Sequence, residues 1–211
     1  NLTLINTGAL DLGAGTVGGN LNATSNNGAI TQTGALSVTG TATLDAGTSS
    51  VTLTQAGNNF TGAVSASGAN VALTDANALT LGTVTTTGNL TLINTGALNL
   101  GTSTVGGNLN ATSNNGAITQ AGVLDVAGTT LLNAGTGSVT LTNAGNDFTG
   151  TVTATAAATS LTDTNALTLG ASTFSGGFSA TSGDTLTVAG NLTSTATSGT
   201  GISLTAAKLV Q

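Results

Sequence analysis

The sequence predicts an all-β fold, a right-handed parallel β-helix (β-solenoid) whose coils stack along one axis. Three observations predict it. The chain repeats itself with a period of 88 residues, apolar residues alternate with polar ones, and the common residue types are weak helix formers. Such strict repetition is typical of arrays in which each unit contacts only its neighbours. Function is therefore expected from length and surface rather than from an enclosed pocket.

The repeat is nearly identical over its first part. Residues 1–34 read NLTLINTGALDLGAGTVGGNLNATSNNGAITQTG, and residues 89–122 differ from them at only four positions. The match continues more loosely as NNFTG and NDFTG, then as TDANALTLG and TDTNALTLG. The chain starts at a repeat boundary and stops inside a copy, so we expect it to be an excerpt of a longer protein. The single solenoid segment 1–211 then divides into copy 1 at 1–88, copy 2 at 89–176 and a partial third copy at 177–211.

Short runs of alternating apolar residues, such as Leu2 and Leu4 or Val51 and Leu53, predict strands with one buried face. Turns that contain Gly or Asn separate the runs. The repeat divides into quarters of about three strands each, which predicts about 22 residues per coil and roughly nine or ten coils. Parallel crossovers of this kind are almost always right-handed. The proposed quarters are 1–19, 20–40, 41–62 and 63–88.

A column of inward residues follows from this division. It runs through Leu10, Ile30, Val51 and Val71, and continues as Leu98, Ile118, Val139 and Thr159. Two Gln residues, Gln32 and Gln120, are expected to face outward, or to be hydrogen-bonded if they face inward. Eight apolar residues are expected to be buried: Leu10, Ile30, Leu53 and Leu73 with their copy-2 partners Leu98, Ile118, Leu141 and Leu161.

Asparagine recurs at the predicted turns. Asn tolerates a left-handed backbone and caps turns with its own side chain, and stacked Asn can also form amide ladders. The recurring residues are Asn6, Asn26, Asn27, Asn58 and Asn77, with their partners 88 residues later.

Composition excludes several function classes. The net charge is -6 and Lys208 is the only cation, so nucleic acid and anionic membrane surfaces are poor partners. No apolar run approaches the roughly 18 residues of a spanning helix, so no membrane insertion is predicted. The anions are Asp11, Asp45, Asp75, Asp125, Asp147, Asp163 and Asp184.

Catalysis is not predicted. The chain has no His and no Cys, which removes Ser–His and thiol nucleophiles and the usual zinc ligands. Asp75 and Asp163 would lie four coils apart, about 19 Å, too far for a glycosidase pair. Replacements between copies, such as Asn59 by Asp147, are expected to create no cluster of titratable groups. We predict no enzyme, and no catalytic, cofactor-binding or metal-binding residue.

Two turns carry an Asp-x-Asn sequence, at 75–77 and 163–165. Each supplies two oxygen ligands, whereas calcium requires six to eight, so turn capping is favoured over a calcium site. Six Asn-x-Thr sequons leave N-glycosylation open. They begin at Asn1, Asn22, Asn59, Asn89, Asn110 and Asn191.

The strings GNLTL, GAITQ, GALSVTG, VTLTQAGNNFTG and DANALTLG together resemble the repeats of very large bacterial surface exoproteins, the filamentous haemagglutinin-like adhesins of the two-partner secretion route. The resemblance covers essentially the whole chain. It implies a right-handed parallel β-helix at the bacterial cell surface, secretion through an outer-membrane β-barrel partner, and a long shaft that holds an adhesive or toxic tip. It offers no binding residue to carry over.

Three functions stay open. The first is a structural shaft or spacer of a secreted adhesin, in which a deletion of 89–176 is expected to remove four whole coils. The second is a repeat unit of an extracellular or biofilm-matrix filament, whose partners are flanking repeats or end-to-end copies of the chain. Because its end coils are uncapped and its charge is low, an isolated fragment is expected to be unstable or to self-associate. The third and least favoured is an ice-binding solenoid, suggested by the pairs Thr31/Thr33, Thr41/Thr43, Thr52/Thr54 and Thr85/Thr87.

Overall fold

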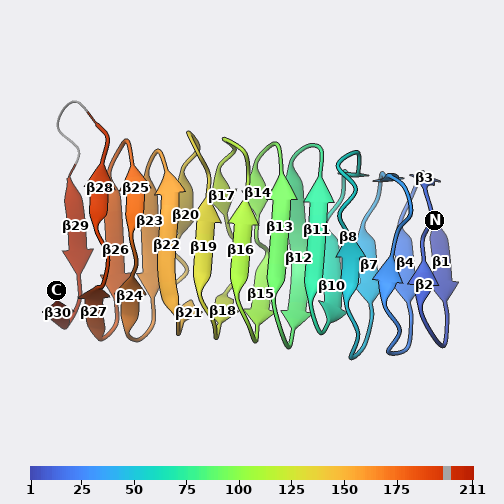
Figure 1. The fold of residues 1–211 in the computed structure, drawn as a ribbon, viewed down its shortest axis with the longest axis horizontal. Coiled ribbons are helices and arrows are strands. Elements are labelled where there is room, and N and C mark those ends of the chain that lie inside the picture. Colours follow the sequence, from blue (N-terminus) through green and yellow to red (C-terminus); the bar gives the residue numbers. More distant parts are fainter. Residues whose placement is uncertain (197–200) are drawn as a thin grey trace.

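The computed structural model describes residues 1–196 and 201–211 and shows one rod built of parallel strands, with no helix in these residues (Figure 1). The strands stack into about 10 turns of about 20 residues each. Every pairing between strands is parallel, from β1 on β4 to β27 on β30. The two termini lie at opposite ends of the rod (Figure 1). The predicted parallel β-solenoid is confirmed.

Each coil has three strand positions, which we call faces 1, 2 and 3 in chain order. Face 1 carries β1 (Leu2–Ile5), β4 (Leu21–Thr24), β7 (Ala42–Asp45), β10 (Val64–Gly68), β12 (Leu79–Thr86), β15 (Thr102–Val105), β18 (Leu124–Val126) and β21 (Asp147–Phe148). Face 2 carries β2 (Leu10–Asp11), β5 (Ile30–Thr31), β8 (Val51–Leu53), β11 (Val71–Asp75), β13 (Leu90–Asn94), β16 (Leu109–Thr112), β19 (Thr130–Asn133) and β22 (Thr151–Ala156).

Face 3 is built in two parts. It begins with β3 (Gly15–Val17), β6 (Leu36–Val38) and β9 (Asn59–Phe60), which form a sheet of their own. It continues, from the first residues of β12, with β14 (Leu98–Asn99), β17 (Ile118–Thr119), β20 (Val139–Leu141), β23 (Thr159–Asp163), β26 (Phe178–Ser182) and β29 (Ile202–Thr205). The last coils also contain β24 (Leu167–Leu169), β25 (Ser172–Phe174), β27 (Thr185–Val188), β28 (Leu192–Ser194) and β30 (Lys208–Val210).

One apolar core runs along the rod. Of the eight apolar residues expected to be buried, Leu10 is only partly buried, because the first coil has a neighbour on one side only. All four Phe residues are buried, and the rings of Phe174 and Phe178 lie 5.3 Å apart. The alternation prediction is therefore confirmed, with these residues buried: Ile30, Leu53, Leu73, Leu98, Ile118, Leu141 and Leu161.

The inward column departs from the prediction at the boundary between the copies. Val71 is in register with Leu90, not with Leu98. Leu98 stacks on Leu79 instead and continues the second part of face 3. The error came from dividing the repeat by four: the coils are shorter than expected, so each repeat holds more than four of them. Leu81, for example, stacks directly on Val64, a shorter step than the length of any proposed quarter.

Asparagine side chains link successive coils at the turns. The Oδ1 of Asn89 accepts the backbone N–H of Asn108 at 2.8 Å, and the Oδ1 of Asn108 accepts that of Thr129 at 2.8 Å. The backbones of Asn27 and Asn115 are left-handed, with φ of 73° and 76°. Left-handed backbone is therefore confirmed at Asn26, Asn27 and their copy-2 partners, but Asn6, Asn58, Asn77 and their partners do not have positive φ. The Oδ1 atoms of Asn27 and Asn115 accept backbone N–H groups of the next coil.

Two Thr hydroxyl groups enter the core without a partner. Thr130 and Thr159 are each 1% exposed, and their Oγ1 atoms make no hydrogen bond. Copy 1 has Ala42 and Val71 at the equivalent positions, both buried. A buried hydroxyl without a partner costs free energy because it gives up its bonds to water.

We therefore expect Thr159→Val to raise the free energy of unfolding by about 1 kcal/mol, since Val has nearly the shape of Thr and removes the unpaired hydroxyl. The reverse change in copy 1, Val71→Thr, is the matched control and should lower it by about 1–3 kcal/mol. Denaturant unfolding of both variants measures the two effects. Destabilisation by Thr159→Val would show that the hydroxyl has a partner.

Candidate functional site

Polar side chains gather in the core at two equivalent places, which we call the junctions. The first junction consists of Gln32, Asn58 and Asp75, and the second of Gln120, Asn146 and Asp163. The Asn and Asp residues are fully buried, with exposures of 0% to 2%. Each junction lies where β9 or its equivalent β21 is followed by a short coil.

The two amides of each junction bond reciprocally. The Nε2 of Gln32 donates to the Oδ1 of Asn58 at 2.7 Å, and the Nδ2 of Asn58 donates to the Oε1 of Gln32 at 2.8 Å. The Oδ1 of Asn58 also accepts the backbone N–H of Leu36. The second junction repeats the pair at 2.7 and 2.9 Å. Both Gln residues are thus partly buried and hydrogen-bonded, the second of the two predicted outcomes.

The carboxylate of Asp75 takes the place of a missing strand. Its Oδ2 accepts the backbone N–H of Phe60 at 2.6 Å, and its Oδ1 accepts that of Asn77 at 2.7 Å. In copy 2, Asp163 bonds Phe148 and Asn165 in the same way, at 2.7 and 2.8 Å. The predicted turn-capping role of the two Asp-x-Asn sequences is confirmed.

Burial acts against the charge of these carboxylates. It raises the pKa of Asp75 above its ordinary value, although the bonds from Phe60 and Asn77 act to lower it. Burial likewise raises the pKa of Asp163, and the nearby Asp147 carboxylate raises it further. The partly exposed Asp45 behaves oppositely, because the hydroxyl of Ser67 and the N–H of Gly47 hold its pKa below the usual range.

Copy 2 brings two carboxylates together that copy 1 does not have. Asp125 and Asp147 are in register on neighbouring strands, where copy 1 has Ser37 and Asn59. The expectation that differences between copies create no cluster of titratable groups is therefore wrong. The two positions are distant in sequence but only one coil apart in space. Among the described residues, no group of three or more His, Cys, Asp or Glu could hold a metal ion.

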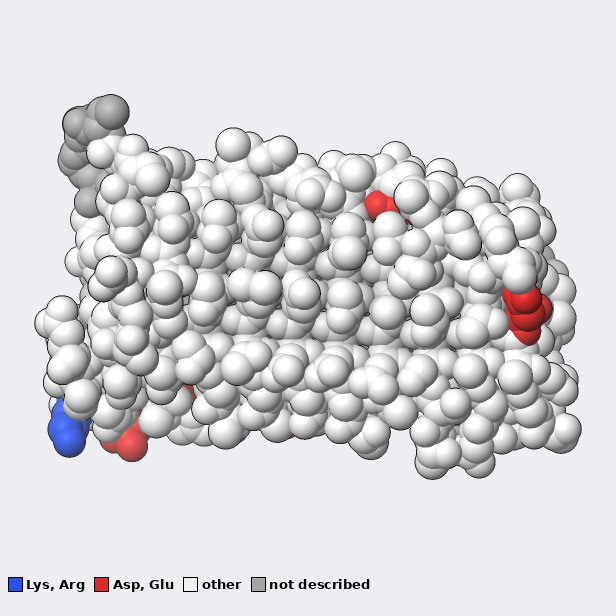
Figure 2. Space-filling view, in the orientation of Figure 1, with Lys and Arg blue, Asp and Glu red and all other residues white. Residues whose placement is uncertain are grey.

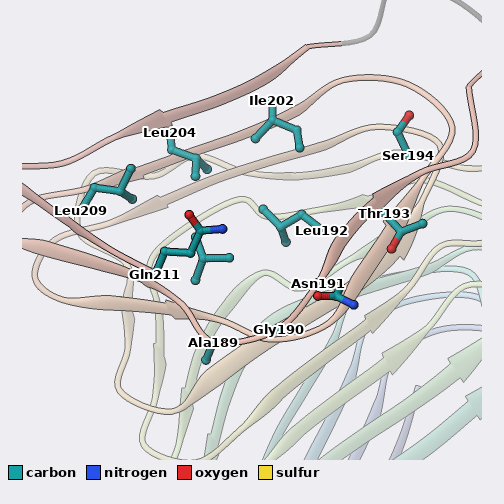
Figure 3. Close-up of a pocket in the computed structure, with 11 residues that line it drawn as sticks. Ala189, Gly190, Asn191, Leu192, Thr193, Ser194, Ile202, Leu204, Leu209 and Gln211 are labelled. Carbon is teal, nitrogen blue, oxygen red and sulfur yellow. The ribbon is translucent and has the colours of Figure 1, made fainter.

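A hollow of about 710 Å³ lies at the C-terminal coil (Figure 3). Both apolar and polar side chains line it. They are Leu192, Ile202, Leu204 and Leu209, together with Asn191, Thr193, Ser194 and Gln211. It is the end of the apolar core, and Leu209 there is 59% exposed. A shallower groove of 230 Å³ crosses face 1 beside Asp45 and is lined mainly by Ser and Thr.

The face of the rod shown in Figure 2 carries few charged atoms, in keeping with a chain that has one cation and seven Asp residues. Lys208 lies in β30, at the C-terminal end. Within residues 1–196 and 201–211, no helix has the length and apolar character needed to cross a membrane.

The repeat matches one known family model, described as repeats of unknown function (DUF5649), over residues 1–67, 68–98, 88–155 and 156–208. The chain belongs to this family. No curated protein and no solved structure matches the chain. The family description names no activity, so the resemblance to filamentous haemagglutinin-like exoproteins stays a prediction.

The raised pKa values of Asp75 and Asp163 predict that the stability contributed by these two groups depends on pH. Between the ordinary pKa of 3.8 and the raised value, the folded chain binds more protons than the unfolded chain. The contribution of these groups to stability should therefore rise as the pH falls through this window, and should be lost as the pH rises through the folded pKa.

Denaturant unfolding as a function of pH, for the parent chain and for the double variant Asp75→Asn/Asp163→Asn, measures this contribution. The difference between the two free energies should shift in favour of the parent chain as the pH falls. A difference that stays constant across the window would contradict the raised pKa values.

Proposed function

We propose that this chain is a structural shaft or spacer of a large secreted bacterial surface adhesin, and that it acts by length and rigidity. One observation carries the proposal: a single core passes without a break through two copies of nearly the same sequence. Each copy thus adds length while it repeats the surface of the other. A spacer needs this property.

Rigidity comes from bonding between coils. Successive coils pair their strands, except where β9 and β21 end their stacks, and the Asn side chains at the turns add bonds between coils. A bend of the rod would have to break these bonds between coils on one side, and it would also expose the apolar core that lies directly beneath them. The junctions add buried hydrogen bonds once per repeat.

Placement at the bacterial cell surface, and export through an outer-membrane β-barrel partner, are supported by the resemblance of strings such as GAITQ and VTLTQAGNNFTG to haemagglutinin-like exoproteins. The lack of Cys suits a chain that crosses membranes unfolded. The tip that such a shaft carries would supply the binding activity.

Deletion of 89–176 from the parent protein tests the spacer function. The register of the strands makes this deletion four and one third coils, not the four expected from the sequence, so the rod should shorten by about 21 Å. Adhesion should weaken only as far as reach is lost. The matched control replaces 89–176 by a second copy of 1–88, which restores the length and should restore adhesion.

If adhesion or binding of a soluble ligand returned only with the genuine copy 2, the spacer function would be wrong. A lateral binding face on copy 2 would then replace it. Electron microscopy of the purified variants checks that their lengths differ as expected.

A second candidate, the repeat unit of an extracellular filament, is favoured by the C-terminal coil, where the apolar side chains of Ile202 and Leu209 are exposed beside a hollow. Strands β29 and β30 each pair with one strand among the described residues, so each has an outer edge that another coil can bond. A second copy stacked end to end would cover both the hollow and these edges.

This filament candidate predicts that the purified chain self-associates and that Leu209→Asp prevents it, because a carboxylate at the hollow would be buried on stacking. Leu131→Asp is the matched control, since Leu131 is 43% exposed but lies on the side of the rod. Light scattering as a function of concentration measures both. Equal effects of the two variants would argue against end-to-end stacking.

A further inference from the structure

Equivalent residues of successive copies lie on different faces of the rod. Leu2 begins the stack of face 1 and pairs with Leu21. Its copy-2 equivalent, Leu90, stacks on Val71 on face 2. The third-copy equivalent, Phe178, stacks on Thr159 on face 3. Figure 1 shows β13 and β16 in one row with β11, which belongs to copy 1.

The register gives the size of this advance. Leu10 lies one face after Leu2, and it is followed on face 2 by Ile30, Val51, Val71 and Leu90. Leu90 is thus four coils beyond Leu10. The 88-residue repeat therefore advances by four coils and one further face, which is four and one third turns.

The short coil at each junction sets this advance. After Asp75 closes the edge of β9, Leu81 stacks on Val64 after a shorter step than in the coils before it. The register then shifts within the pair of β10 and β12. In copy 2, Leu169 stacks on Val152 in the same manner, next to the junction of Asp163. The step recurs once in each copy, so it belongs to the repeat itself.

We infer that the number of repeats sets the orientation of the rod as well as its reach. One added or removed copy turns everything beyond it by a third of a turn. Three copies make thirteen whole coils and restore the original orientation, because three thirds complete a turn. The orientation of the rod beyond the repeats thus changes by one face with each added repeat.

The advance also distributes the surface of the repeat around the rod. Thr3 and Asn22 are neighbours on face 1, whereas their equivalents Thr91 and Asn110 are neighbours on face 2. A partner that recognises the repeat would meet the same strip on each side in turn. Binding to a flat lattice such as ice needs one continuous face with the same residues in every coil. The equivalent residues Thr52 and Thr140 lie on faces 2 and 3, so the repeat does not place its threonines on one face.

Pairs of spin labels test the advance in the intact chain, which has no Cys of its own. Ala72 and Thr91 are in register on neighbouring strands, about 4.8 Å apart, so labels at Ala72→Cys/Thr91→Cys should show strong dipolar broadening. Labels at Ala72→Cys/Asn99→Cys should show none. Thr80→Cys/Asn99→Cys is the positive control, because these two residues are also in register.

If the repeat were a whole number of coils, Asn99 would lie beside Ala72. The pair with Asn99 would then show broadening, and the pair with Thr91 would show none. Broadening in the pair with Asn99 and none in the pair with Thr91 would therefore overturn the inference. Because each pair replaces exposed or half-exposed side chains, folding of every variant can be checked by its circular dichroism.

A deletion tests the rotation itself. In the intact chain Ser179 lies on face 3 beside Ser160. After deletion of 89–176 it should take the place of Thr91, so labels at Ala72→Cys/Ser179→Cys should gain broadening that the intact chain lacks. The inference would be overturned if the label at Ser179→Cys showed broadening with a label at Ser65→Cys on face 1 instead. It would also be overturned if Ser179→Cys showed broadening with neither label in a folded deletion variant. If the deletion variant does not fold, the pairs in the intact chain decide.

Discussion

Stacking each coil in parallel register on the previous one is the constraint on which the rest of the structure depends. Each backbone N–H and C=O of a coil must find its partner one coil away, so the coils approach closely everywhere, including at the turns. A Cβ added at Gly116 would lie 2.0 Å from the carbonyl oxygen of Gly96, and one at Gly137 would lie 2.2 Å from that of Gly116. These turns stack glycine on glycine because no side chain fits between them.

The junctions occur where this constraint cannot be met by a strand. β9 is the last strand of its sheet, and the N–H of Phe60 would be buried without a partner if Asp75 did not accept it. The Gln32–Asn58 pair fills the adjoining corner with groups that satisfy each other. This arrangement removes water from the Asp75 carboxylate, which costs free energy in the charged form and therefore raises the pKa of Asp75. The same short coil gives the repeat its extra third of a turn.

Alternation in the sequence was enough to predict the fold and its buried residues, because burial of one strand face is a local property. Long-range register was not predictable in this way. The segments starting at Asn1, Asn20 and Thr41 follow one another more closely than four equal coils per repeat would allow, which is a sign of shorter coils. The short coil at the junction depends on Asp75, whose partner Phe60 lies 15 residues away. Contacts such as Gln32 with Asn58, 26 residues apart, follow only once the register is known.

The extra third of a turn in each repeat also affects solubility. The chain has few charges, so repulsion between neighbouring rods is weak, and a continuous apolar stripe would favour lateral association. Ile5 and Ile93 are equivalent and exposed, yet they lie on faces 1 and 2. Leu131 is exposed on face 2, whereas its copy-1 equivalent, Thr43, lies on face 1. A repeat of whole coils would place the equivalents Ile5 and Ile93 on one side of the rod, whereas the extra third of a turn separates them; within copy 2, Ile93 and Leu131 still share face 2. The feature that sets orientation thus also separates equivalent exposed apolar residues of successive copies, which helps to keep a long, weakly charged rod from associating laterally.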